Sequence, residues 1–159
     1  MSDISTGART AVLPWLALAL LSLPGMGVSA YLTYSHYADE ATICAGVGSC
    51  ELVQTSEYSA IAGVPVAPMG LAYFVAVALL ASARLLRVPL ALDQATPAAF
   101  AMAIGGTAFV GYLTAVELFV LEAICPWCVS VAVMTVISLG FVVWARFAEA
   151  SDEDGLQPP

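Results

Sequence analysis

The hydrophobic pattern along the chain consists of four long uncharged runs separated by short polar stretches. The runs cover residues 11–34, 58–83, 94–116 and 123–145. A helix that crosses the hydrocarbon core of a bilayer needs about 20 mostly apolar residues, and each run supplies that many. We therefore expect an all-α integral membrane protein built as a bundle of four transmembrane helices.

Composition supports this prediction, because 61% of the residues are hydrophobic and only 10% are charged. An ordinary soluble domain carries far more charge. The first run follows Arg9 and ends in small residues as a secretory signal does, but it is too long for a signal core and is interpreted as a retained helix. We expect one membrane domain over residues 1–147 and a disordered, acidic cytoplasmic tail over residues 148–159.

The positive charges predict the orientation of the helices. All four are arginines, namely Arg9, Arg84, Arg87 and Arg146, and they lie before the first run, after the second and after the fourth. The connections 36–64 and 121–125 carry acidic residues and no arginine. Since positive charge accumulates on the cytoplasmic side, we expect both termini in the cytoplasm and both cysteine-bearing connections outside it.

One cysteine pair stands at the predicted start of the fourth helix, as Cys125, Pro126, Trp127 and Cys128. Proline suits the first helical position. The free N–H groups and the positive end of the helix dipole stabilise a thiolate there, which favours a redox role for the pair. A structural disulfide and half of a zinc site are the alternatives; the apolar first turn argues against zinc, and we assign no metal site.

The other pair, Cys44 and Cys50, encloses a short glycine-containing loop. A disulfide across so small a ring stabilises a fold by only about 2 kcal/mol, so turnover is a better explanation for it than bracing. We interpret the two pairs as two disulfides in series, through which electrons pass from the outer pair to the inner pair. No haem, flavin or nucleotide motif is present to accept electrons from Cys128, so we expect a small lipid-soluble acceptor, a quinone held among the helices.

A short extracytoplasmic half-helix is predicted to start at Cys50. Ser49 is the expected N-cap, and Glu51 favours the first turn. Gly63 and Pro65 are expected to end this segment before the second membrane helix. Its apolar face would consist of Leu52, Val53, Tyr58 and Ile61.

Taken together, these residues resemble the bacterial form of the vitamin K epoxide reductase family. The resemblance covers nearly the whole chain and depends on order and spacing. It is carried by Cys44, Cys50, Ser56, Tyr58, Gly63, Val64, Pro65, Gly70, Tyr73, Glu117, Cys125, Pro126, Trp127 and Cys128.

The resemblance implies a membrane thiol–disulfide oxidoreductase with Cys44, Cys50, Cys125 and Cys128 as its catalytic residues. Cys44 would form the mixed disulfide with an exported thioredoxin-like dithiol oxidase, and Cys50 would attack Cys125. Cys128 would then lie against the quinone, with Ser56 as a polar residue nearby.

The same resemblance implies a multi-pass protein of the bacterial inner (cytoplasmic) membrane. The quinone would be of the menaquinone, ubiquinone or phylloquinone type. The chain carries no fused thioredoxin-like domain, so the expected partner is a separate protein. Its spacing between Cys44 and Cys50 is shorter than in the animal branch, which favours disulfide generation over epoxide reduction.

Three residues and two rival functions stay open at this point. Glu117 is either a proton donor to a reduced quinone or a hydrogen-bonding partner of another helix. Trp127 either stacks on the quinone or anchors its helix, and His36 is interpreted as an interfacial residue. The rival functions are a shuttle carrying electrons outward from the cytoplasm and a non-enzymatic four-helix membrane protein with static disulfides.

Overall fold

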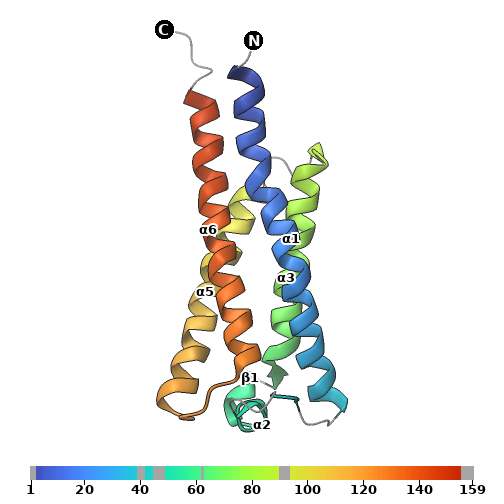
Figure 1. Ribbon diagram of the computed structural model, residues 1–159, viewed down its shortest axis with the longest axis vertical. Helices are drawn as coiled ribbons and strands as arrows, with labels where there is room; N and C mark the ends of the chain where they lie inside the picture. The colour runs from blue at the N-terminus through green and yellow to red at the C-terminus, as the bar shows by residue number, and fades with distance from the viewer. Residues whose placement is uncertain (1–2, 39–41, 45–48, 62, 90–93, 155–159) are drawn as a thin grey trace.

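The computed structural model describes residues 3–38, 42–44, 49–61, 63–89 and 94–154. Within these residues the chain is almost entirely helical (Figure 1). The elements are α1 (Asp3–Ala38), α2 (Cys50–Gln54), the 3-10 helix η1 (Glu57–Ser59), β1 (Ala60–Ile61), β2 (Val64–Pro65), α3 (Val66–Leu85), α5 (Ala95–Phe119) and α6 (Pro126–Asp154).

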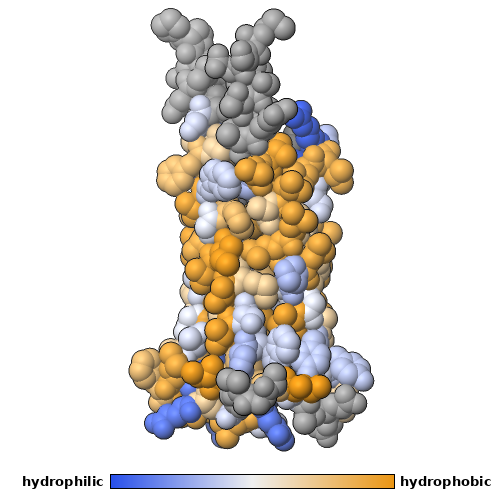
Figure 2. All heavy atoms as spheres, viewed as in Figure 1, coloured by the Kyte–Doolittle hydropathy of each residue, from blue (hydrophilic) through white to orange (hydrophobic). Residues whose placement is uncertain are grey.

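Four of the helices are long and apolar enough to cross a membrane, which confirms the predicted fold. The crossing segments are Val12–Ala38, Val66–Leu85, Ala95–Phe119 and Pro126–Ser151. On the face seen in Figure 2, hydrophobic side chains predominate over the middle of the molecule, and the most hydrophilic ones lie toward its two ends. Such a band is what a lipid-facing surface requires, because exposed apolar side chains there contact hydrocarbon rather than water.

Small residues let the four helices approach closely. Helix α1 packs against α3 and α6, and α5 packs against α6. A Cβ atom on Gly25 would lie 2.5 Å from the ring of Phe74, and one on Gly106 would lie 2.8 Å from the ring of Tyr73. Since lipid tails are as apolar as the side chains, such close packing, rather than release from water, holds membrane helices together.

The start of α1 and the end of α6 lie at the same end of the bundle (Figure 1). At this end Arg84 of α3 donates to Glu149 of α6 at 2.7 Å, and the Thr96 hydroxyl of α5 donates to the same carboxylate oxygen at 3.0 Å. The Glu149 carboxylate of α6 is therefore hydrogen-bonded to both α3 and α5. The short elements α2, η1, β1 and β2 cover the opposite end.

The structure confirms one predicted boundary and corrects two others. The second membrane helix starts at Val66, directly after Pro65 as predicted, and the residues before it form a small antiparallel hairpin of β1 and β2 in which Gly63 has a φ of 81°. The short helix at Cys50 is present as α2, but it ends at Gln54. Residues 148–154, expected to be disordered, continue α6, where Glu149 is held by Arg84; residues 155–159 of the expected tail lie outside the described residues.

Candidate redox site

The outer cysteine pair is closed. Cys44 and Cys50 form a disulfide, with 6.0 Å between their Cα atoms. Cys50 is the first residue of α2, and its backbone N–H donates to the Cys44 sulfur at 3.0 Å. The Cys50 side chain is only 1% exposed. An approaching dithiol therefore has access from the Cys44 side of this bond.

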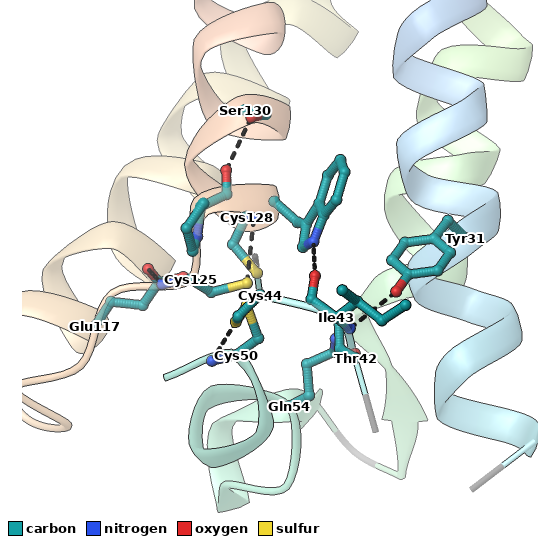
Figure 3. Close-up of a disulfide and its surroundings, with 12 residues drawn as sticks. Tyr31, Thr42, Ile43, Cys44, Cys50, Gln54, Glu117, Cys125, Cys128 and Ser130 are labelled. Carbon is teal, nitrogen blue, oxygen red and sulfur yellow. Dashed lines mark hydrogen bonds between the residues drawn. A yellow bond between two sulfur atoms is a disulfide. The ribbon is translucent and has the colours of Figure 1, made fainter. Parts of the chain in front are cut away.

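The segment 42–44, which carries Cys44, is fastened to three helices (Figure 3). The Ile43 N–H donates to the Tyr31 hydroxyl of α1 at 3.0 Å, and the Ile43 carbonyl accepts from the Trp127 indole of α6 at 2.9 Å. The Gln54 amide of α2 donates to the Thr42 hydroxyl at 2.6 Å. We call these three hydrogen bonds the strap. No local sequence pattern indicates the strap, because its bonded residues lie 12 to 84 positions apart along the chain.

The inner pair lies at the start of α6, as predicted, with both thiols free. The Cys128 N–H points at the Cys125 sulfur, 3.4 Å away, and the Cys125 carbonyl accepts from Val129. A hydrogen bond from the Cys128 thiol, together with the backbone N–H groups of Cys128 and Trp127, lowers the pKa of Cys125 from 9.0 to about 7, although burial and the nearby Glu117 act in the opposite direction. Near neutral pH a large share of Cys125 is therefore the nucleophilic thiolate.

The two pairs are brought together by a backbone contact between their segments. The Ser49 N–H donates to the Ile124 carbonyl at 3.0 Å, so the residues directly before Cys50 and Cys125 are hydrogen-bonded. Figure 3 shows all four cysteines converging between α2 and the start of α6. Ser49 is the N-cap residue of α2, as predicted, but its side chain makes no capping hydrogen bond, and its N–H joins the two segments.

Glu117, near the end of α5, is the acidic group of the site. Its side chain is 5% exposed. One carboxylate oxygen accepts from the Cys125 N–H at 3.2 Å, and the carboxylate is also within hydrogen-bonding reach of the Cys128 thiol. The Glu117 carbonyl accepts from Ala123, which turns the chain back toward α6. The hydrogen bond to the next helix that the sequence suggested is therefore present, and it ends at the redox motif.

A largely apolar pocket adjoins the inner pair. About 820 Å³ of space not filled by atoms lies between the four membrane helices and the outer connection, part of it open to the surroundings. Cys128 and Glu117 line it, and so does Ser56, whose hydroxyl donates to the Val53 carbonyl at 2.7 Å. The other lining residues are Ser29, Leu32, His36, Val53, Gln54, Tyr58, Ser59, Pro65, Val66, Ala67, Gly70, Val110, Leu113, Thr114, Val116, Leu121, Val131 and Ala132.

The pocket also contains two polar groups for which the sequence suggested no such place. His36, interpreted as an interfacial residue, lines the pocket from α1. Ser29 lies seven residues before His36 on α1 and is buried. Its hydroxyl has no hydrogen-bonding partner among the described residues. A buried hydroxyl without a partner is unfavourable unless a ligand supplies one. The site therefore combines a free thiol, an apolar wall and an unused hydrogen-bonding group.

A comparison with models of known protein families gives a match over most of the chain. The model described as the vitamin K epoxide reductase family matches residues 16–143. The matched range includes most of each membrane helix and all four cysteines. The match therefore covers the complete candidate site rather than one motif.

Proposed function

The chain belongs to the vitamin K epoxide reductase family, and we propose that it oxidises a separate exported thioredoxin-like dithiol protein and reduces a membrane quinone. Family membership implies a membrane thiol–disulfide oxidoreductase. The observation that carries the finer proposal is the convergence of two cysteine pairs on a pocket among the helices, with Cys128 in its wall. The net reaction converts the partner's dithiol and a quinone to a disulfide and a quinol.

We assign the first exchange to Cys44. A thiolate of the partner attacks Cys44, which breaks the Cys44–Cys50 bond and releases Cys50 as a thiolate. The partner's second thiol then attacks the mixed disulfide, so that the partner leaves oxidised and the outer pair is left reduced. Burial of Cys50 supports this order, because it leaves Cys44 as the accessible sulfur.

Internal exchange comes next. Cys50 attacks Cys125 of the inner disulfide and releases Cys128, and Cys44 then attacks Cys50 to restore the outer disulfide. The inner pair now holds both electrons. The hydrogen bond between Ser49 and Ile124 supports direct exchange, because it holds the two segments side by side.

The pocket fits a quinone as the electron-accepting substrate. Its wall is mainly apolar, as a flat lipid-soluble ring requires, and it places Cys128 beside the bound molecule. The Ser29 hydroxyl, which lacks a partner among the described residues, can donate to a quinone oxygen. Ser56 lines the same pocket and is proposed to bind there as well. A bound quinone accepts two electrons and two protons.

We place the cysteine end outside the cytoplasm, in a bacterial inner membrane. Arg84 and Arg87 follow α3, and Arg146 lies in the last part of α6, which is the end of the bundle opposite α2. Positive charge marks the cytoplasmic side, so both termini are assigned to it. The cysteines then face the compartment in which exported proteins acquire their disulfides.

The test is an anaerobic reaction of the purified protein with a reduced thioredoxin-like dithiol protein and menadione or a short-chain ubiquinone. We expect loss of quinone absorbance in step with oxidation of the dithiol. Cys44→Ala and Cys128→Ala should each abolish it. A variant of the dithiol protein that lacks its second cysteine should remain bonded to Cys44 of the wild-type protein as a mixed disulfide that gel electrophoresis detects, because its thiolate breaks the Cys44–Cys50 bond and nothing then releases it.

Persistence of all disulfides in the presence of the dithiol, with no quinone consumed, would contradict the proposal. It would favour instead a non-enzymatic membrane protein with static disulfides. Quinone reduction that survives Cys44→Ala would contradict the series arrangement while leaving the inner pair as a quinone reductase.

A further inference from the structure

Oxidation of the inner pair must dispose of protons as well as electrons. When Cys125 and Cys128 form a disulfide, two electrons leave the sulfurs and two thiol protons are released. The quinone oxygens take up two protons as the electrons arrive. Cys125 is buried, and Cys128 faces a pocket in the bundle. Proton transfer there needs an acceptor that touches the reacting thiols.

The Glu117 carboxylate lies where such a proton acceptor is needed. It accepts from the Cys125 N–H at 3.2 Å, reaches the Cys128 thiol and lines the pocket. It therefore lies beside the inner pair and faces the same pocket as Cys128, where the quinone would take up a proton. No other carboxylate among the described residues lines this pocket.

The surroundings of Glu117 supply a hydrogen bond but no positive charge to balance a buried carboxylate, among the residues that the structure describes. The ion pair between Arg84 and Glu149 is at the opposite end of the bundle, and none to Glu117 is present in the described part of the chain. The ionisable groups that face it are Cys125 and Cys128, and His36 and Tyr58 line the same pocket from α1 and the outer connection. An unpaired acid at membrane depth is costly, and such residues mark proton paths.

We propose that Glu117 carries the Cys128 proton to the quinone, an inference that rests on the function proposed above. The carboxylate takes the thiol proton as Cys128 gives up its electrons, and Cys125 attacks the Cys128 sulfur to close the disulfide. The protonated Glu117 then donates to one quinone oxygen. The Cys125 proton leaves to water, and the second quinone oxygen takes a proton from water, so two electrons and two protons are transferred in all.

The first test contains no quinone. A Cys44→Ala, Cys50→Ala protein keeps only the inner pair, and ferricyanide oxidises it by taking electrons alone. At about pH 6, below the Cys125 pKa of about 7, both sulfurs carry protons. We expect about one proton per disulfide in the medium, because Glu117 retains the other. The Glu117→Gln protein, which can still accept from the Cys125 N–H, should release about two.

Glu122→Gln is the matched control, because it removes the same charge from an exposed residue five positions away. It should release the same number of protons as its parent protein, and Glu117→Asp should also retain one. Two protons released with Glu117 intact, or equal counts in the parent and Glu117→Gln proteins, would overturn the proposal.

The second test uses the four-cysteine protein and menadione in a single turnover. Glu117→Gln should slow oxidation of the reduced inner pair on the order of a hundredfold, which is typical of a lost general base. Reduction of the outer disulfide by the dithiol protein should be unchanged. Equal quinone rates in the two proteins would overturn the proposal. If the wild type itself passes no electrons to the quinone, the proposed function fails, whereas the proton count separately decides whether Glu117 accepts the Cys128 proton.

Discussion

Replacing Trp127 with phenylalanine tests whether the strap controls access to the outer disulfide. The indole N–H donates to the Ile43 carbonyl at 2.9 Å, and the ring centroid lies 5.4 Å from that of Tyr31. Phenylalanine retains an aromatic ring for this packing but has no N–H to donate. The substitution therefore removes one of the three hydrogen bonds that hold the segment carrying Cys44.

The expected magnitude follows from that single bond. A hydrogen bond contributes about 1 kcal/mol net, which corresponds to roughly a fivefold change in the population of the detached segment. Tyr31→Phe removes the bond from the Ile43 N–H and should have a similar effect. The two bonds share Ile43, so the rate increases caused by the two substitutions should not simply multiply in the double variant.

Reduction of the Cys44–Cys50 disulfide by a small monothiol is the assay, followed by mass spectrometry of the alkylated peptides. We expect Trp127→Phe to be reduced about fivefold faster than wild type, because detachment exposes the Cys44 sulfur. Trp144→Phe is the control: the same replacement on the same helix, where the indole packs against Phe141. Equal rates in wild type and Trp127→Phe, or an equal increase in Trp144→Phe, would refute the reasoning.

Two further predictions concern thiol ionisation and helix packing. Ultraviolet absorbance of the Cys125 thiolate should rise with pH around a midpoint of about 7, and Cys128→Ala should move the midpoint upward, toward 9.0, because a hydrogen bond to the thiolate is lost. Gly25→Ala should destabilise the bundle by about 1–3 kcal/mol, since the new methyl group would meet the buried Phe74 ring. Gly27→Ala, with no atom within 4 Å, should not lower the melting temperature; an equal loss in both would contradict the packing argument.

The membrane helices could be predicted because their signal is local and long. Each needs only a run of apolar residues, and all four are found where the runs predict them. The helix start at Cys50 and the placement of Cys125 and Pro126 were also predictable from neighbouring residues. Their roles in catalysis stay proposals, as does the binding role of Ser56.

The contacts that complete the site depend on residues far apart in the chain. Trp127 and Ile43 are 84 residues apart, and nothing in either neighbourhood indicates that they are bonded. Glu149 was placed in a disordered tail because its neighbours are acidic, whereas Arg84, 65 residues away, holds it in a helix. The hairpin of β1 and β2 could not be predicted for a different reason. Each strand has only two residues, which are too few to produce an alternating pattern of apolar and polar side chains.

Burial of Cys50 and Cys125 has a consequence for how selectively the protein handles electrons. With 1% and 0% of their side chains exposed, the two sulfurs assigned to internal exchange are shielded from dissolved thiols and oxidants. In the proposed relay, small molecules in the surrounding fluid would therefore not reach the electrons that pass between the two pairs. Losses can then occur only at the two outlets, Cys44 and Cys128, so the yield of disulfides per quinol depends on how well those two positions choose their reactants.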